Sequence, residues 1–550
     1  MAYTDLENIQ RLLDRFKRPI PPGNIYQTRL AEEFELILNQ RFTDYFIQIC
    51  DIIDLTTDLT HMTRGSAGSS LVCYLLGITD VDPIEWSIPV ARFMNPLRDD
   101  LPDVDIDFEH WRQTEVMERI FKKWPGMTAR LSNYVTYKEK SARREAAKRL
   151  GATGNLPRNF TYDSVGVDPK EAKRIEGKLM GKKRAISKHC GGIVMFTRQL
   201  PKSLISQDNQ ILLDKYEVED LEHLKVDILA NRGLSQLLEI DGVTQLRHYP
   251  KEDKATSDLL SRGDVLGVTQ GESPAMRRLF RAIKPKSVYD CVFATAMIRP
   301  VAMSGRQKAA MFQDWSKEVV QDSIVFEDDA IDIISNIIGV DMYEADMYRR
   351  AFAKKNDEKI LEFVERLGNN PRKAEAMAAL QELSGFGLCR AHAVNLGRLI
   401  WALAYQKAHN PEDFWRANLK HCQGSYRPWV YQCEGHRKGL TVKSGWWTQG
   451  FPKGMGVKQQ WLDHVSYAGV IANGRVFRGK NGKWVTFLTL GTNYGEYIDV
   501  TVQKPLGYRD GDIVAGQGVV KHQNNSDYIE SRSHKVHSFS SWSNRGQNKY

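Results

Sequence analysis

The chain contains 550 residues, of which 42% are hydrophobic and 26% charged, and its formal net charge is +9. This length exceeds what one hydrophobic core normally serves, so we expect several globular domains. The sequence has no apolar run long enough to span a bilayer, no signal-peptide core in its first ten residues, and no CxxC pair among its seven cysteines. These features argue against a membrane protein, an exported protein and a zinc protein, and they predict a protein of the cytoplasm.

The first 76 residues predict helices around a turn of small residues. Residues 1–24 form a polar lead-in that ends at the sequence RPIPPG, and residues 25–60 carry apolar side chains at helical spacing. The turn GSAGSS, residues 65–70, then opens an apolar helix. The N-terminal amides of that helix form a natural seat for a phosphate group.

Three aspartates alternate along the predicted strand LPDVDIDFEH, residues 101–110. A β-strand turns every second side chain to one face, so the carboxylates of Asp103, Asp105 and Asp107 gather on one side. A solvated edge strand, a calcium loop and a two-metal site compete as explanations. A calcium loop of the EF-hand type needs glycine and glutamate where this sequence has Phe108 and Thr114, which excludes it. In a two-metal site, paired carboxylates hold Mg²⁺ ions that activate an attacking hydroxyl and neutralise a leaving phosphate.

A strongly basic segment lies between Lys138 and Lys188. It holds fifteen lysines and arginines against six acids, which gives this segment alone a net charge of +9. Its two predicted helices carry basic side chains at helical spacing, namely Lys140, Arg143, Arg144, Lys148, Lys170, Lys173, Arg174, Lys178 and Lys182. One such face is usually only solvated, but two in succession favour a grip on the phosphate backbone of a nucleic acid.

The pattern of apolar residues changes from strand-like to helical in the rest of the chain. Two apolar runs, KHCGGIVMF and LKVDIL, predict strands, and the second places Asp227 and Lys225 on the same side. An acid and a lysine inside an apolar strand need partners, so Asp227 is the candidate third carboxylate of a two-metal site. Helical periodicity dominates from about residue 233 to residue 425.

The last part of the chain predicts a small β-barrel. Residues 465–535 contain about five short strand patterns separated by turns, and the polar residues 536–550 are predicted to be disordered. Trp484, Phe487 and Tyr497 can stack on unpaired bases or pack in the core. The basic residues that can meet phosphates beside them are Arg475, Arg478, Lys480 and Lys483.

Six ordered blocks between residues 25 and 430 resemble one protein family. They are RGSAGSSLVCYLLGITDVDPIEWSIPVARFMNPLRDDLPDVDIDF, KHCGGIVM, LKVDILANRGL, GVTQGESPAMRRL, ADMYRRAFAKK and GFGLCRAHAVNLGRLIWALAYQKAHNPEDFW. The chain resembles the bacterial replicative DNA polymerases of family C, the polymerase III alpha subunits. The resemblance implies an α+β multidomain fold, with a nucleotidyltransferase-type palm on a mixed sheet, a helical thumb and fingers, and a C-terminal OB-like β-barrel.

We draw the expected domain boundaries from the resemblance and from changes in the residue pattern along the chain. They are a lead-in over 1–24, a palm over 25–132 and 186–232, a basic helical thumb over 133–185, fingers over 233–430, a linker or helix-hairpin-helix remnant over 431–464, an OB domain over 465–535 and a tail over 536–550. The family's N-terminal PHP domain and a clamp-binding peptide have no visible counterpart, and Arg299-Pro300-Val301-Ala302 replaces the family's RPGP. We therefore expect a compact polymerase, encoded by a bacterium or by a virus in a host cytoplasm.

The resemblance also implies site residues, position by position. The metal ligands and catalytic residues are Asp103, Asp105 and Asp227, with Asp107 in support. The residues implied to contact the incoming nucleotide are Gly65, Ser66, Arg92, Arg98, Lys225, Arg349 and Arg350, with Lys354 and Lys355 as helpers. The candidate DNA contacts are Lys140, Arg143, Arg144, Lys148, Lys173 and Arg174 on the basic helices, together with Lys188 and His189 at the active-site floor. Structural packing is the alternative for His189 and the favoured interpretation for His392.

The function implied is templated addition of deoxynucleotides to a primer 3′-hydroxyl in DNA replication. Two Mg²⁺ ions, which Mn²⁺ can replace, are the expected cofactors. The expected partners are primer–template DNA and deoxynucleoside triphosphates, with a sliding clamp or other replisome proteins as further candidates, and no membrane. Two alternatives stay open, an inactive DNA-binding relative and a nucleotidyltransferase that needs no template.

Overall fold

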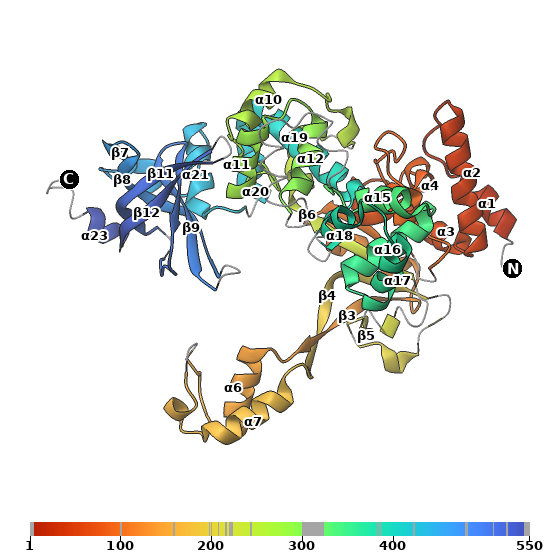
Figure 1. The fold of residues 1–550 in the computed structure, drawn as a ribbon, viewed down its shortest axis with the longest axis horizontal. Coiled ribbons are helices and arrows are strands. Elements are labelled where there is room, and N and C mark those ends of the chain that lie inside the picture. The colour runs from red at the N-terminus through yellow and green to blue at the C-terminus, as the bar shows by residue number, and fades with distance from the viewer. Residues whose placement is uncertain are drawn as a thin grey trace.

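The computed structural model describes residues 5–98, 102–157, 160–196, 199, 201–206, 208–214, 217–218, 224–242, 245–299, 324–381, 383, 387–421, 424–478, 482–509, 511–523 and 526–543. Figure 1 shows an elongated molecule, with the N-terminal helices at one end, a β-barrel at the other and a narrow arm projecting from the side. None of the helices in these ranges has the length and apolar character needed to span a bilayer. The altered RPGP position, apart from Arg299, lies outside the described residues.

The first sheet is mixed and has six strands in the order β1-β2-β6-β4-β3-β5. These are β1 (His61–Arg64), β2 (Val104–Glu109), β3 (Thr128–Thr136), β4 (Lys183–Met195), β5 (Gln210–Asp214) and β6 (Leu224–Asn231). β2 and β6 are parallel neighbours, and β1 and β4 pair antiparallel on either side of them. The alternation predicted for β2 is confirmed, because Val104, Ile106 and Phe108 are fully buried on one face and the aspartates turn to the other.

Helices from the N-terminal part cover the apolar face of this sheet. They are α1 (Asp5–Leu13), α2 (Asn24–Asn39), α3 (Thr43–Asp54), α4 (Leu71–Leu75) and α5 (Gln113–Lys123). Their apolar side chains share one core with β2 and β6. The predicted lead-in contributes to that core, since Leu12 of α1 is fully buried in it.

The arm is an extension of two strands of the first sheet. β3 and β4 run out as a ribbon and carry α6 (Glu139–Arg149) and α7 (Pro169–Leu179) beyond the sheet, as Figure 1 shows in orange. α7 begins with the Asp168 side chain accepting the amides of Lys170 and Glu171, and with proline at the first helical position. The arm has a small core of its own, which includes Ala147, Phe160 and Ala172.

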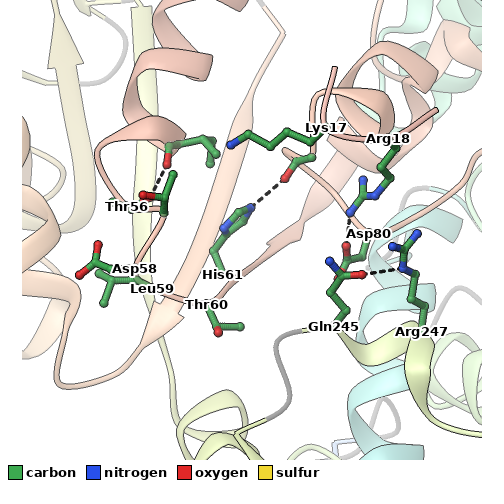
Figure 2. Close-up of a pocket in the computed structure, with 13 residues that line it drawn as sticks. Lys17, Arg18, Thr56, Asp58, Leu59, Thr60, His61, Asp80, Gln245 and Arg247 are labelled. Carbon is green, nitrogen blue, oxygen red and sulfur yellow. Dashed lines mark hydrogen bonds and ion pairs between the residues drawn. The ribbon is translucent and has the colours of Figure 1, made fainter. Parts of the chain in front are cut away.

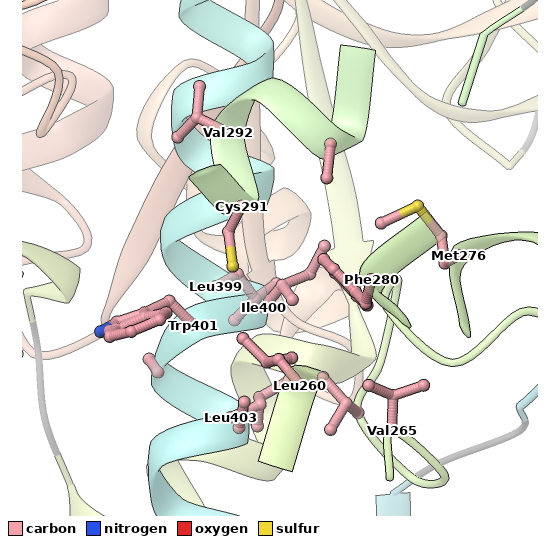
Figure 3. Close-up of a cluster of buried hydrophobic side chains, with 14 of the residues drawn as sticks. Leu260, Val265, Met276, Phe280, Cys291, Val292, Leu399, Ile400, Trp401 and Leu403 are labelled. Atoms are coloured by element: carbon pink, nitrogen blue, oxygen red, sulfur yellow. The ribbon is translucent and has the colours of Figure 1, made fainter. Parts of the chain in front are cut away.

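The region after the first sheet is helical, as predicted. α19 (Arg390–His409) runs through a core formed with α10 (Lys254–Ser261), α11 (Pro274–Ile283) and α12 (Val288–Met297), and Figure 3 shows the side chains that fill it. Gly397 lets α19 approach α12 closely, because a Cβ there would lie 2.6 Å from the backbone of Val292. A separate helical cluster consists of α15 (Asp329–Ile338), α16 (Met342–Lys354), α17 (Asp357–Leu367) and α18 (Lys373–Gln381). This region also contains α9 (Arg232–Asp241), α20 (Pro411–His421), α21 (Pro428–Arg437) and α22 (Trp446–Gln449).

The C-terminal part is a closed five-stranded β-barrel with one added strand. Its strands are β8 (His464–Arg478), β9 (Trp484–Asn493), β10 (Glu496–Val502), β11 (Ile513–Gln523) and β12 (Ser526–His537), and pairing of β11 with β8 closes the ring. The predicted fold class is therefore confirmed: a mixed α/β core with a palm-like sheet, many helices and an OB-like barrel.

Two segments near the barrel differ from the prediction. The sequence PKGMGVKQQWLDHV is not a helix-hairpin-helix remnant, because β7 (Gly456–Trp461) pairs antiparallel with β8 to form a β-hairpin. The predicted disorder from residue 536 does not hold for 536–543, where β12 ends and α23 (Phe539–Ser543) follows. Phe539 stacks on Trp446, and the Trp542 indole donates to the carbonyl of Lys453, so aromatic contacts hold this end. Residues 544–550 lie outside the described part.

Candidate active site

Three carboxylates meet at one end of two neighbouring strands. Asp103 and Asp105 lie at the start of β2, and Asp105 is directly opposite Asp227 in the parallel register of β6. One oxygen from each of the three carboxylates lies within 4.8 Å of the others. We call Asp103, Asp105 and Asp227 the carboxylate cluster.

The carboxylate cluster fits a hard divalent cation. All three donors are carboxylate oxygens, the ligands that Mg²⁺ prefers. The Oδ1 atom of Asp227 is buried, and it has no hydrogen-bond partner among the residues that the structure describes. A buried carboxylate oxygen without a partner costs free energy, which a bound cation would recover.

The electrostatics of the carboxylate cluster also favour a bound cation. Burial raises the pKa of Asp105 to about 8, and the negative charges of Asp103 and Asp227 add to this shift. Lys225 offsets part of the repulsion, since its Nζ lies 3.2 Å from Asp103 and 3.3 Å from Asp227. One lysine therefore faces three carboxylates, and the excess of negative charge remains for metal ions.

Asp107 does not join the cluster. Its carboxylate is buried, and it accepts hydrogen bonds from Arg64 at 2.6 Å and from Asn231 at 2.8 Å. Arg64 is opposite Asp105 in the β1–β2 register. Asp107 thus links β1 and the end of β6 to the strand that carries Asp105.

The small-residue turn lies directly against the cluster. Gly65 opens the 3₁₀ turn η1 (Gly65–Ser69) with a positive φ of 73°, and a Cβ there would lie 3.3 Å from Asp105 Oδ2. Glycine is therefore required both for the backbone conformation and for the close approach.

The predicted phosphate seat on the following helix is wrong. Glu33 of α2 is fully buried, and it accepts the backbone amides of Leu71 and Val72 at 2.7 and 3.0 Å. The hydroxyl of Ser70 takes the next amide, that of Cys73. A carboxylate of the protein itself thus occupies the helix N-terminus. Sequence spacing could not reveal this partner, because Glu33 lies on a different helix.

Three of the predicted nucleotide-binding arginines meet acids from the α15–α16 cluster. Arg92, in the 3₁₀ turn η2 (Val90–Arg92), donates to Glu327 at 2.9 Å. Arg349 on α16 is buried; it lies 2.7 Å from Asp346 and 3.6 Å from Glu327. Arg98 lies 3.8 Å from Asp346. We call Arg92, Arg98, Arg349, Glu327 and Asp346 the arginine–acid cluster; Arg350, Lys354 and Lys355 lie next to it in sequence on and after α16.

Lys188 and His189, the two residues predicted at the active-site floor, lie in different environments. His189 lies beside the carboxylate cluster, with Nδ1 3.7 Å from Asp227, and this nitrogen accepts the amide of Gly192 at 2.6 Å. Lys188 points elsewhere and pairs with Asp208 at 3.1 Å. Burial, together with the charges of Arg64 and Arg299, lowers the pKa of His392 to about 4, so this side chain is neutral at pH 7.

Three of the predicted DNA contacts on the arm have partners within the arm itself. Arg143 covers the rings of Phe160 and Tyr162, and Arg144 donates to the carbonyl of Leu156, so both hold the arm's own loop. Arg174 pairs with Glu171 on α7. A cavity of about 500 Å³ between the helices and the ribbon is instead lined by basic residues: Arg149, Lys178, Lys182, Lys183 and Arg184. The charge count of the segment signalled this surface; helical spacing selected Lys178 and Lys182 among its residues, but not Arg149, Lys183 or Arg184.

The barrel offers two of its three predicted stacking residues. Trp484 and Phe487 are exposed, and Phe487 stacks on Phe477 with the ring planes 11° apart. Tyr497 is turned inward, where it donates to Glu434 of α21 at 3.2 Å. Of the two alternatives left open for Tyr497, stacking or packing, the structure supports packing. Lys480 lies outside the described residues.

A further pocket lies at the opposite end of β1 from the carboxylate cluster. Figure 2 shows its labelled residues, which include Lys17, Arg18, His61, Asp80 and Arg247, around a cavity of about 420 Å³. Arg18 pairs with Asp80, and Arg247 donates to Gln245 at 2.7 Å. None of the carboxylate cluster lines this pocket.

A mixed sheet that gathers carboxylates on adjacent strands beside a glycine-serine turn defines a palm of the nucleotidyltransferase type. The family model for the bacterial DNA polymerase III alpha NTPase domain matches residues 6–230, and the model for the finger domain of the same subunit matches residues 232–374. The chain belongs to the family of bacterial DNA polymerase III alpha subunits.

Curated relatives agree with this assignment. An error-prone DNA polymerase of Burkholderia mallei is 29% identical over 513 residues, which cover 78% of this chain and 48% of that protein. An error-prone DNA polymerase of Saccharophagus degradans is 29% identical, covering 72% and 44% of the two chains. A DNA polymerase III subunit alpha of Staphylococcus aureus is 28% identical, covering 76% and 45%. The chain thus spans about half the length of these relatives.

Proposed function

We propose that the chain is a template-directed DNA polymerase that extends a primer 3′-hydroxyl with deoxynucleoside triphosphates in DNA replication. The observation that carries this proposal is the carboxylate cluster, in register on adjacent strands, with Gly65 and Lys225 against it. The first sheet is the proposed palm, the arm the thumb, and the helices of 233–430 the fingers. A cytoplasmic site of action and a sliding clamp or other replisome protein as partner belong to the same proposal.

Each part of the site has a role in this reaction. Asp103, Asp105 and Asp227 would hold two Mg²⁺ ions, which supply a lowered hydroxyl pKa and neutralisation of the leaving pyrophosphate. Lys225 holds the orientation of Asp103 and Asp227 and places a positive charge beside the triphosphate. The turn at Gly65 and Ser66 brings the substrate's phosphates next to Asp105, and Arg92, Arg98, Arg349 and Arg350 are the proposed triphosphate contacts. His189, held by the amide of Gly192, orients one side of the cluster.

Primer extension tests the proposal directly. The protein is incubated with Mg²⁺, four deoxynucleotides and either a labelled primer–template or the same primer alone. We expect extension that follows the template sequence and stops at the template end, and no extension of the unpaired primer. Equal extension of both substrates would instead identify a template-independent nucleotidyltransferase. DNA binding without any extension would identify an inactive relative.

The cavity of the arm should contribute most of the thumb's grip on duplex DNA. The double variant Lys183→Glu and Arg184→Glu is expected to weaken binding at low salt by about tenfold or more and to lower the salt slope by about two, since each lost phosphate contact removes about one unit. Fluorescence anisotropy of a labelled duplex at several salt concentrations measures both quantities. Lys170→Glu, on α7 outside the cavity, is the matched control and should change binding much less.

A further inference from the structure

Two arginines from different parts of the molecule share one carboxylate oxygen. Arg92 of η2 and Arg349 of α16 approach Oε2 of Glu327 at 2.9 and 3.6 Å. The two arginines are close enough to repel each other, because burial and then the charge of Arg92 lower the pKa of Arg349. Glu327 is the acid that faces both guanidinium groups, whereas Asp328 lies 3.9 Å from Arg92 and Asp346 lies 2.7 Å from Arg349.

The backbone around Glu327 is built to hold this side chain in place. The amide of Glu327 donates to the carbonyl of Leu388 at 3.1 Å. Gly387 leaves the space that the side chain fills, since a Cβ at Gly387 would lie 2.4 Å from Cγ of Glu327. The carboxylate still reaches the surface, because 20% of the Glu327 side chain is exposed. The Glu327 carboxylate is therefore fixed in position but accessible to solvent.

Glu327 differs in this from the second acid of the cluster. Asp346 is fully buried and accepts a hydrogen bond from Arg349 Nε within the same helix, so this pair is local to α16 and shielded from solvent. η2, which carries Arg92, packs on η1, and Gly65 of η1 lies so near Asp105 that an added Cβ would be 3.3 Å from its Oδ2 atom. The Glu327 carboxylate is thus connected to the carboxylate cluster through two adjoining turns.

We propose that Glu327 is a specificity residue, which occupies Arg92 and Arg349 in the nucleotide-free protein and must be displaced by the phosphates of the incoming nucleotide. This inference rests on the proposed function. A carboxylate and a terminal phosphate present the same kind of oxygen to a guanidinium group, so they compete for the same donors. A triphosphate replaces the lost anion completely, whereas a diphosphate offers one phosphate fewer. Glu327 therefore favours triphosphates over diphosphates.

The test compares nucleotide binding in two isosteric variants. The protein is bound to a primer–template with a dideoxy-terminated primer and Mg²⁺, and the Kd values of the matching deoxynucleoside triphosphate and diphosphate are measured by titration calorimetry. We expect Glu327→Gln to bind both nucleotides more tightly, the diphosphate by roughly tenfold, and thus to discriminate less between them. A purely structural role for Glu327 would only weaken binding.

The matched control is Glu344→Gln. Glu344 lies on α16 and pairs with Arg366 at 2.5 Å, so its substitution removes the same charge from the same helical cluster without touching Arg92 or Arg349. Unchanged or weaker binding by Glu327→Gln, or equal tightening by both variants, would overturn the inference. If Glu327→Gln does not fold, Glu327→Asp keeps the charge but cannot reach both arginines, and it should also tighten binding. Wild-type protein that binds nucleotide but does not extend primers would refute the proposed function alone.

Discussion

Replacement of Asp105 by asparagine is expected to reduce primer extension by about a thousandfold or more, because several kcal/mol of metal-dependent stabilisation of the transition state are lost. The same change should leave the metal-free protein as stable as the wild type or more stable, since it replaces a carboxyl group whose ionised form is disfavoured by burial and by two neighbouring carboxylates. Single-nucleotide extension rates and thermal unfolding without Mg²⁺ measure the two effects. Loss of activity without loss of stability separates a catalytic residue from a structural one.

Asp107→Asn is the control for this experiment, because Asp107 lies two positions along the same strand. Its carboxylate is paired with Arg64 and Asn231 outside the cluster, so we expect lower stability and a far smaller loss of extension. Equal losses of activity in the two variants, with equal losses of stability, would show that the aspartate strand is only structural. The unmodified protein and both variants should bind primer–template DNA alike.

Mg²⁺ binding is expected to depend strongly on pH. The pKa of Asp105 is raised to about 8 from an ordinary value of 3.8, so the metal-free folded protein keeps this proton at neutral pH whereas the unfolded chain releases it. The folded state therefore binds more protons between these values, and the stability of the metal-free protein falls as the pH rises through that window. A metal ion must displace the proton, so the apparent Mg²⁺ affinity should rise by about tenfold per pH unit below pH 8.

Thermal unfolding with and without Mg²⁺ at several pH values between 6 and 9 checks this result. The stabilisation by a subsaturating Mg²⁺ concentration should grow with pH and level off above pH 8. Asp105→Asn should remove the pH dependence, because the residue that titrates is gone. An Mg²⁺ affinity that stays constant from pH 6 to 9 in the unmodified protein would contradict the assignment of Asp105 as a ligand.

The local pattern of the sequence predicted the sheet and its carboxylates well. The alternation along β2 could be predicted because every second side chain of a strand points to the same face. The same rule places Lys225 and Asp227 on one face of β6. The barrel strands could be predicted for the same reason. The exact register of Asp105 with Asp227 could not be derived from spacing, because it depends on how two strands separated by more than a hundred residues pair.

The partners of charged side chains were largely invisible in the sequence. Glu33 takes the helix amides that were predicted for phosphate, and Glu327 takes two arginines that were predicted for the nucleotide. Arg143 was predicted for DNA, but it covers two aromatic rings of the arm. In each case the partner lies on another element, so neither helical spacing nor charge count could identify it. The order of residues 536–543 was missed similarly, because it depends on contacts with distant tryptophan and lysine residues.

The strand β4 connects the cavity of the arm with the carboxylate cluster. Lys183 at its first residue lines the cavity of the arm, and Gly192 near its other end is paired with Asp227. The strand is irregular between these two residues, because Arg130 of β3 pairs with Ile193 and Ser132 of β3 pairs with Lys188, so five residue steps of β4 lie opposite two of β3. The amides of Gly191 and Gly192 in this bulge both donate to Nδ1 of His189. The arm is therefore joined to the carboxylate cluster through a bulged segment of β4, and a change of direction of the arm would be felt first at His189 beside Asp227.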